Sequence, residues 1–400
     1  MRKFSPEEEL CWLALLMVPG LGPRRAKLLL DQFGSPMSIF QASVSELQAA
    51  GLPGSLAQSI ASGCSFEEAV NQQAKARATG AEILTLADER YPPLLREILD
   101  PPVVLFARGR LELLQQPMLG VVGTRRPTPY GKAVAERIAA DLTRFGLVIV
   151  SGMARGIDTA AHEGALSAGG GTVAVFGCGL NHVYPAENRK LAERIAQQGV
   201  ILSEFPFETP AHPQNFPIRN RLISGMSWGV LVVEGAQYSG SAITARLALD
   251  QGREVFAIPG NITSKMSWCP NLLIKQGAIL VQEAADVVEG LPTPVRTLLL
   301  SQRSLPLGDA SSEQEARGRG EPDPVADLGP MSGLARNLLN HLQIDHAIHL
   351  DELLDRLQPA SSSEIIAVLF ELELRGLVRQ LAGKKFVKVW GGEQRSAARA

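Results

Sequence analysis

The chain has 400 residues, of which 45% are hydrophobic and 20% charged, and its formal net charge is -2. This length predicts two or three domains with a sizeable core. The near-neutral charge excludes a polycationic protein, so any nucleic-acid surface has to be a local patch. The four cysteines form no Cys-x-x-Cys pair, which predicts neither a zinc site nor a disulfide framework and favours a reducing cytoplasm. They are Cys11, Cys64, Cys178 and Cys269.

Residues 1–65 read as a module of short helices separated by Gly and Pro. Their apolar run at 10–18 is too short to span a bilayer, and Glu7, Glu8 and Glu9 stand where a secretory signal is positive. We therefore expect a buried helix there and no membrane segment in the chain. The segment 18–26 predicts a helix-hairpin-helix (SAM-like) module, whose hairpin either offers amides to DNA phosphates or packs against protein.

A different pattern begins at residue 118 and continues to about 290. Compact, β-branched apolar runs alternate with helical segments such as 131–145 and 187–198. This alternation predicts an α/β fold with a Rossmann-like, doubly wound, mostly parallel sheet and helices on both faces. We take 66–290 as the core with its lead-in, in which 103–106 is expected to form an edge strand. The runs expected as buried strands are 119–122, 147–150, 172–176, 200–202, 230–233, 255–258 and 279–281.

The composition changes again after residue 290. We expect a flexible linker over 291–330, because 309–330 are rich in Ser, Gly, Pro and charge and have little to bury. Helices at 334–342, 349–357 and 364–375, followed by a hairpin with a strand at 385–390, predict a winged helix over 331–392. The third helix carries Glu364, Glu371 and Glu373 against Arg375 alone, which favours protein interaction over DNA reading.

Two early loops of the core have the composition of anion sites. In a doubly wound sheet, ligands bind beyond the carboxyl ends of the strands. After the first strand, Gly123-Thr124-Arg125 supplies close backbone approach and a fixed charge, without the G-x-G-x-x-G of a dinucleotide site. After the second strand, Ser151 and Gly152 suit phosphate contact. The alternatives are a tight turn with solvated arginines for the first loop and a helix cap for the second.

Two later loops carry further binding groups. Arginine and amide groups before a helix hold phosphates, and an aromatic face can stack a base. The groups of this kind after the strand at 200–202 are Phe216, Arg219, Asn220 and Arg221. The alternative there is a basic helix start with a buried phenylalanine. Ser239, Gly240 and Ser241 precede another helix, where they either bind an anion or cap the helix.

Three titratable side chains raise the question of catalysis or metal binding. Asp158 and His162 stand four residues apart, so a metal or acid–base pair is an alternative to a helix cap and a hydrogen-bonded histidine. Because no third ligand completes a metal motif, we expect no metal. We also expect no cofactor and no catalytic residue. Glu234, at a predicted strand end, either serves a hydrolase or orders its loop by hydrogen bonds.

The motifs of the core also occur in a characteristic order. They are Gly123-Thr124-Arg125, Ser151-Gly152-Met153-Ala154-Arg155-Gly156-Ile157-Asp158 with His162, Gly177-Cys178-Gly179-Leu180, Tyr184-Pro185, Ser203-Glu204, Asn215-Phe216-Pro217-Ile218-Arg219-Asn220-Arg221, Ser239-Gly240-Ser241 and Pro259-Gly260-Asn261. In this order they closely resemble the DprA (DNA-processing protein A) family, over about residues 91–290. The N-terminal helices and the winged helix are similar to appendages of that family, with less specificity.

The resemblance implies a Rossmann-like homodimer that binds single-stranded DNA without sequence preference. It implies protection of incoming DNA and loading of the recombinase RecA onto it during natural transformation, against competing single-strand-binding protein. The positions that it implies to face DNA are Gly123, Thr124, Arg125, Phe216, Arg219, Asn220 and Arg221. The resemblance departs at Cys269, which stands where a glycine is expected and puts the local turn in question.

The main rival interpretation is an enzyme. Related Rossmann-like proteins hydrolyse the N-glycosidic bond of nucleotides with a Pro-Gly-Gly-x-Gly-Thr loop and a following glutamate. Here the loop reads Ser239-Gly240-Ser241, and no acid follows until Asp250. We therefore expect a binding protein and not an enzyme. A second rival is a protein that binds a free nucleotide in the same crevice.

Overall fold

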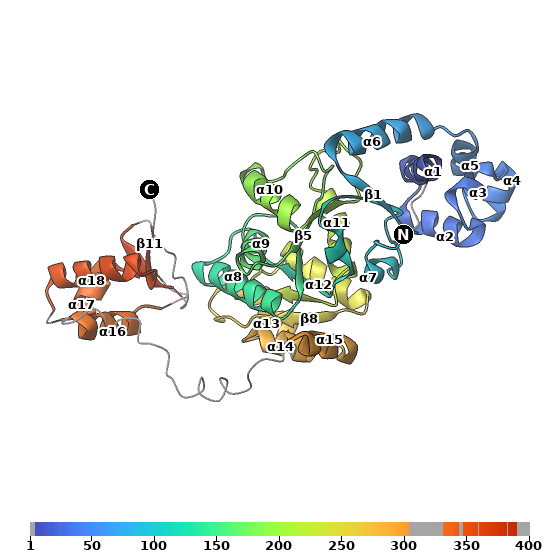
Figure 1. Ribbon diagram of the computed structural model, residues 1–400. Helices are drawn as coiled ribbons and strands as arrows, with labels where there is room; N and C mark the ends of the chain where they lie inside the picture. The colour runs from blue at the N-terminus through green and yellow to red at the C-terminus, as the bar shows by residue number, and fades with distance from the viewer. Residues whose placement is uncertain (1–4, 304–330, 344–346, 359, 382, 390–400) are drawn as a thin grey trace. The chain divides into compact units, whose positions relative to one another are not determined.

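The structure is a computed structural model that describes residues 5–303, 331–343, 347–358, 360–381 and 383–389 (Figure 1). The chain divides into two compact units. The first includes the described residues up to 127 and from 135 to 303, and the second includes the described residues after 330. Residues 304–330, where most of the linker is expected, lie outside the described residues.

The N-terminal part consists of short helices, as the Gly and Pro spacing predicts. Ser5 begins α1 with a capping box, in which its hydroxyl accepts from the Glu8 amide and the Glu8 carboxylate accepts from the Ser5 amide. Gly20 has a φ of 80° in the hairpin between the first two helices, a backbone conformation that favours glycine. The helices are α1 (Pro6–Met17), α2 (Pro23–Phe33), α3 (Pro36–Gln41), α4 (Val44–Ala49), α5 (Gly54–Ala61) and α6 (Phe66–Thr79).

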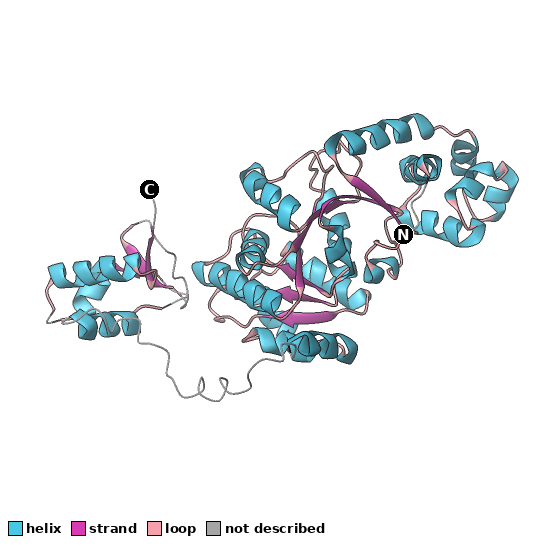
Figure 2. Cartoon of the chain, in the orientation of Figure 1, coloured by secondary structure: helices cyan, strands magenta, loops and turns pink. Residues whose placement is uncertain are grey.

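A sheet, magenta in Figure 2, forms the centre of the first unit. It has nine strands in the order β1-β2-β6-β5-β4-β3-β7-β8-β9. The pairs from β6 through to β9 are parallel, whereas β1 with β2 and β2 with β6 are antiparallel. This confirms the mostly parallel, doubly wound sheet. The strands are β1 (Glu82–Thr85), β2 (Val104–Gly109), β3 (Met118–Val122), β4 (Val148–Ser151), β5 (Thr172–Val175), β6 (Val200–Ser203), β7 (Gly229–Val232), β8 (Glu254–Ala257) and β9 (Ile279–Leu280).

The prediction of an edge strand at 103–106 is wrong. The strand exists as β2, but it pairs on one side with β6 and on the other with β1, which is the true edge. Sequence reasoning missed β1 because Glu-Ile-Leu-Thr contains only two apolar residues, fewer than the runs that indicated the other strands. The burial of Val104, Leu105 and Phe106 follows from this interior position.

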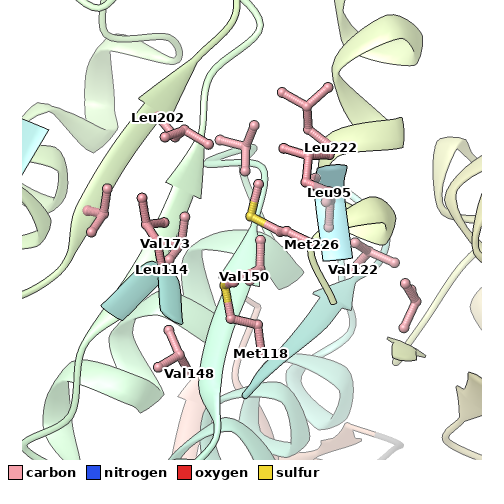
Figure 3. Close-up of a cluster of buried hydrophobic side chains, with 14 of the residues drawn as sticks. Leu95, Leu114, Met118, Val122, Val148, Val150, Val173, Leu202, Leu222 and Met226 are labelled. Carbon is pink, nitrogen blue, oxygen red and sulfur yellow. The ribbon is translucent and has the colours of Figure 1, made fainter. Parts of the chain in front are cut away.

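Helices cover both faces of the sheet, and side chains that alternate along each strand pack against them. On one face, residues of β3 to β6 contact α11 and α7, as Figure 3 shows for Val150, Val173 and Leu202 with Leu222 and Leu95. On the other face, Ala174 and Ile201 pack with α9 and α10. The helices of the core are α7 (Pro93–Arg96), α8 (Pro129–Arg144), α9 (Ile157–Ser167), α10 (Arg189–Gln198), α11 (Asn215–Gly225), α12 (Gly240–Asp250), α13 (Trp268–Lys275) and α14 (Ala284–Gly290). Short 3-10 helices lie at η1 (Leu111–Gln115), η2 (Ala186–Asn188) and η3 (Lys265–Ser267).

The N-terminal helices and the first strands share one hydrophobic cluster. Trp12 and Leu15 of α1 and Ile60 of α5 belong to the same buried group as Phe106 of β2 and Phe207 of the loop after β6. The rings of Phe106 and Phe207 meet edge to face, with centroids 5.2 Å apart. The module therefore packs on the β1–β2 side of the core within the first unit.

The helix α15 (Thr293–Arg303) occupies the beginning of the expected linker. Val295 and Leu299 are buried, so the apolar face of this helix packs against the protein and stabilises the segment. A linker that begins at 291 is therefore too early.

The second unit has the winged-helix order of elements. They are α16 (Ser332–His341), β10 (Ile348–His349), α17 (Leu350–Arg356), α18 (Ser362–Leu374), β11 (Val378–Leu381) and β12 (Lys385–Lys388). The strands form an antiparallel sheet in the order β10-β12-β11. His349 was expected in a helix, but it ends β10 and caps α17, accepting from the Asp351 amide. The three helices and the hairpin are confirmed.

Candidate nucleic-acid interface

The candidate site lies at the carboxyl ends of the parallel strands, around the point where the strand order reverses. From β3 the chain proceeds through β4, β5 and β6 on one side, and then returns to β7 on the other side of β3. Ligands of doubly wound sheets bind at this switch point. Here the amide of Thr124, after β3, donates to the carbonyl of Glu234, after β7, over 2.7 Å. The two loops are thus joined across the switch point.

Gly123 is required by this close packing of backbone. A Cβ at this position would lie 2.6 Å from Cγ1 of Ile157 and 2.9 Å from the Glu234 carbonyl oxygen. Such distances are shorter than van der Waals contact, so a larger residue would separate the β3 loop from α9 and from the β7 loop. The glycine that suggested a phosphate loop is explained by packing, and its contact with DNA stays a prediction.

Phe216 lies at the centre of a group of aromatic and cationic side chains. The exposed guanidinium of Arg125 is 5.3 Å from the Phe216 ring centroid. The Tyr184 ring, 42% exposed, lies 5.4 Å from the same centroid at an interplanar angle of 35°. The structure therefore brings together the loop after β3 and the start of α11, as the sequence predicts. Because Phe216 is half-buried, the alternative of a fully buried phenylalanine is wrong.

Arg219 lies one turn along α11 from Phe216, but its side chain points into the protein. It is 3% exposed, and its Nη1 donates to the carbonyl of Gly152 at 2.6 Å and to the carbonyl of Val175. Its Nε donates to Oδ1 of Asn220 at 3.2 Å. Burial lowers the pKa of the guanidinium to about 10, so the group stays charged at neutral pH. The contact of Arg219 with DNA stays a prediction, and these bonds favour an internal role.

Arg221 faces a different part of the protein from Phe216. Its guanidinium contacts the carboxylate of Glu204, lies 3.3 Å from an Asp100 carboxylate oxygen and donates to the Asp100 carbonyl at 2.8 Å. Burial raises the pKa of Glu204 to about 7 despite the charge of Arg221. The structure therefore does not bring Arg221 to the Phe216 group, and its predicted DNA contact has no support from this geometry.

Asp158 and His162 are both buried in α9, and each has a structural partner. The Asp158 carboxylate accepts from the amides of Gly152 at 3.1 Å and Ala154 at 3.3 Å, which orders the loop after β4. Burial raises the pKa of Asp158 to about 6 and lowers that of His162 to about 3. His162 Nδ1 bonds to the Thr172 hydroxyl at 2.8 Å. Among the described residues, no group of three or more His, Cys, Asp or Glu side chains could hold a metal ion.

The predicted serines also bond within the protein. Ser151 donates to the Val121 carbonyl at 2.7 Å, and the hydroxyls of Ser239 and Ser241 are 2.7 Å apart beside the exposed Gly240 at the start of α12. Cys269 is buried next to these two hydroxyls, and burial raises the pKa of its thiol. Because Cys269 is the second residue of α13, the local backbone is helical and does not need the expected glycine. The structure thus has a helix, and not a turn, at Cys269.

Two exposed side chains near the site were not predicted as site residues. They are Tyr184, on the Phe216 ring, and Arg155, in the loop after β4, which pairs with Glu187 at 2.5 Å. Both residues could have been found from the sequence, because each lies inside one of the motifs that resemble the DprA family. Exposure of Tyr184 depends on the fold of the segment between β5 and α10, which periodicity does not reveal.

The chain belongs to the family of the DNA recombination-mediator protein A. The model of that family matches residues 82–292, a DprA winged helix domain matches 321–384, and a SAM-like helix-hairpin-helix tandem matches 13–65. Together with the sheet topology, these matches show a Rossmann-like core with a helix-hairpin-helix module before it and a winged helix after it. Within the described residues, no helix combines the length and apolar character needed to cross a bilayer.

Proteins with considerable similarity come from several bacteria. The DNA processing protein DprA of Bacillus subtilis is 46% identical over 217 residues, which cover 54% of this chain and 73% of that protein. The protein Smf of Escherichia coli is 40% identical over 297 residues, 74% of each chain. The solved structure of DprA from Streptococcus pneumoniae superposes with a TM-score of 0.59 at 34% identity, covering 73% of this chain and 99% of that chain.

Proposed function

We propose that this protein binds single-stranded DNA without sequence preference, through the group formed by Arg125, Phe216 and Tyr184. The observation that carries the proposal is a cation and two aromatic rings in contact at the carboxyl ends of the strands. Base stacking on aromatic faces and phosphate contact by arginine together characterise sites for single strands, and every base has a face that can stack. Membership of a family of DNA recombination mediators supports the same substrate.

The geometry favours a single strand over a duplex. The Tyr184 ring lies in the segment between β5 and α10, and the Phe216 ring is half-buried at the start of α11. A base can stack on such rings only when it has left its own stack, which costs a single strand little and a duplex several kcal/mol. Sequence preference is not required, because every base has a face that can stack and every nucleotide has a phosphate.

The family further supports a role in the handling of incoming DNA. We propose that the protein acts in the cytoplasm as a homodimer, protects single strands and loads RecA onto them against single-strand-binding protein in transformation and recombination. We also propose that it is a binding protein and not an enzyme. What supports this is that the buried Asp158 and His162 hold loops and strands together, so that this pair is not open to a substrate.

The test is a binding titration of the full chain by fluorescence anisotropy. A labelled oligothymidine should bind, and log affinity should fall linearly with log salt, whereas the matching duplex should bind more weakly at each salt concentration. A mononucleotide added in excess should not displace the oligonucleotide if a strand is the ligand. Equal affinity for the duplex would contradict the proposal. Displacement of the oligonucleotide by the mononucleotide would contradict it as well.

A further inference from the structure

Arg219 is a buried cation whose bonds connect three elements of the core. Its guanidinium reaches from α11 to the Gly152 carbonyl, just after β4, and to the Val175 carbonyl, at the end of β5. Carbonyl groups at strand ends have no partner from the ladder, so a fixed guanidinium satisfies both. The side chain thereby attaches the first turn of α11 to two neighbouring strands.

The backbone around Arg219 is built to admit it. A Cβ on Gly152 would lie 2.6 Å from the guanidinium carbon and from both of its terminal nitrogens. Only glycine leaves room for the guanidinium at this point. The glycine after β4, which suggested a phosphate loop, therefore serves the placement of an arginine.

Phe216, one turn earlier on α11, also packs against a glycine. A Cβ on Gly177 would lie 2.9 Å from Cδ1 of the Phe216 ring, so the ring packs directly against backbone after β5. The Arg219 guanidinium carbon is 5.9 Å from the ring centroid, and residues three apart on a helix lie on the same face. Arg219 and Phe216 thus share one face of α11, and Arg219 is the more deeply buried of the two.

Direct contact between Arg219 and DNA would require these bonds to break. The two strand-end carbonyls would then lose this donor, and a buried polar group without a partner destabilises the fold. Arg125 is exposed on the same ring and can meet a phosphate without such a cost. The two arginines therefore have different roles despite their similar distance from Phe216.

From these contacts we infer that Arg219 is a positioning residue, which holds the Phe216 ring in its stacking orientation through α11 and does not itself contact DNA. The inference rests on the proposed binding of single-stranded DNA. It assigns the arginine of the Phe216-Pro217-Ile218-Arg219 motif to the interior of the site, and it makes the affinity for a strand depend on a side chain that the strand does not touch.

A double-mutant cycle in the full chain tests the inference. Affinity for oligothymidine is measured by anisotropy over a salt series for the parent, Arg219→Gln, Phe216→Ala and the double variant. Loss of a stacked base should weaken binding by about 5-fold to 150-fold. If Arg219 acts through Phe216, then Arg219→Gln weakens binding in the parent, leaves the salt slope unchanged, and has no further effect once Phe216 is alanine.

A second arginine supplies the matched control. Arg221 lies on the same helix and is also buried, but it faces Glu204 and Asp100. Arg221→Gln should lower stability without coupling to Phe216, which identifies losses that arise from folding alone. An effect of Arg219→Gln that persists in the Phe216→Ala background, or that flattens the salt slope, would mean direct DNA contact or a general structural role and would overturn the inference.

A measurement without DNA separates failure of the inference from failure of the proposed function. The chain is labelled with 4-fluorophenylalanine, and the Phe216 signal is assigned by its loss in Phe216→Ala. Arg219→Gln should shift or broaden this signal, and Arg221→Gln should not. If the signal stays unchanged in Arg219→Gln, positioning is wrong whether or not the parent binds DNA; if it changes while the parent binds no strand, the proposed function alone fails.

Discussion

The guanidinium of Arg125 lies over the ring of Phe216, with 5.3 Å between its carbon and the ring centroid. Arg125 lies in the loop after β3 and Phe216 in the first turn of α11, 91 positions later in the sequence. In the proposed site, Arg125 makes the phosphate contact and Phe216 supplies the ring on which a base stacks. Charge and stacking are separable by experiment, because only the first depends on salt.

Replacement of Arg125 by alanine should weaken binding to oligothymidine and reduce the slope of log affinity against log salt by roughly 0.7, the contribution of one phosphate on a single strand. Phe216→Ala should cost about 1–3 kcal/mol at an unchanged slope. Anisotropy titrations of both variants over a salt series measure these effects, and circular dichroism confirms folding. A folded Arg125→Ala variant that binds like the parent at every salt concentration would refute the site assignment.

Gly152→Ala should impair binding although it removes no functional group. The new Cβ would stand 2.6 Å from the Arg219 guanidinium, so the arginine has to move and the strand-end carbonyls lose their donor. We expect a loss of stability of about 1–3 kcal/mol and weaker oligothymidine binding. The control is Gly333→Ala, where a Cβ meets nothing within 4 Å. Equal affinity of both variants would show that Gly152 does not matter for this contact.

His162 should make the first unit less stable in mild acid. Its pKa falls from 6.5 to about 3 on burial, so between these values the unfolded state binds more protons and the free energy of unfolding decreases as pH falls. The expected slope is about 1.4 kcal/mol per pH unit. Asp158 acts in the opposite direction, because its raised pKa of about 6 lets the native state take up a proton.

A comparison of parent and His162→Gln isolates the histidine, since Asp158 is common to both. Urea unfolding at pH 6 and pH 4.5 should show a smaller loss of stability on acidification in the variant. The glutamine amide can still donate to the Thr172 hydroxyl, which keeps the replaced hydrogen bond. Identical pH dependence of the two proteins would show that His162 titrates normally in the native state.

Nucleoside monophosphates should not be hydrolysed. Glu234 is the acid nearest to the sequence position of the glycosidase loop, yet it is 3% exposed and its backbone carbonyl accepts from Thr124. Incubation with each monophosphate and chromatography for free base checks this expectation. Base release that copurifies with the protein and disappears in Glu234→Gln would establish an enzyme instead.

The third helix of the winged domain should tolerate polar substitutions on its outer face. Ile366, Phe370 and Leu374 are 49%, 63% and 66% exposed, at a spacing of four residues, whereas Leu369 is 2% exposed. Phe370→Ser should change stability by less than about 0.5 kcal/mol, and Leu369→Ser should cost about 2–5 kcal/mol. Hydrogen exchange of α18 amides in the full chain measures both. Equal protection loss in the two variants would contradict the burial pattern.

Much of the core was predictable, because parallel strands that are buried on both faces consist of short, continuous apolar runs in the sequence. The seven runs expected between 119 and 281 all contain strands, with ends displaced by at most one residue. The strand β1 was not predictable, since it contains only two apolar residues and its pairing with β2 depends on the tertiary fold. The winged helix followed from helix spacing, but the two-residue β10 has too little sequence to detect.

The sequence predicted which loops form the site, but it did not predict which of their side chains point toward the Phe216 ring and which point into the protein. Arg219, Asn220 and Arg221 are consecutive on α11, so successive side chains leave the helix about 100° apart. Sequence adjacency thus suggested one cationic cluster, whereas burial sends Arg219 toward β4 and β5 and Arg221 toward Glu204. The same limit explains Gly123 and Gly152, whose packing partners are far away in sequence.

The hydrophobic cluster that joins α1 and α5 to Phe106 and Phe207 has a consequence for the design of shorter chains. A fragment that begins at residue 91 would lack β1, and β2 would present an unpaired edge of backbone N–H and C=O groups. It would also uncover apolar surface that the N-terminal helices shield. Edges and patches of this kind template intermolecular β pairing. The smallest chain expected to stay monodisperse therefore retains residues 5–303, and aggregation of a bare core would report its exposed edge and not a missing DNA site.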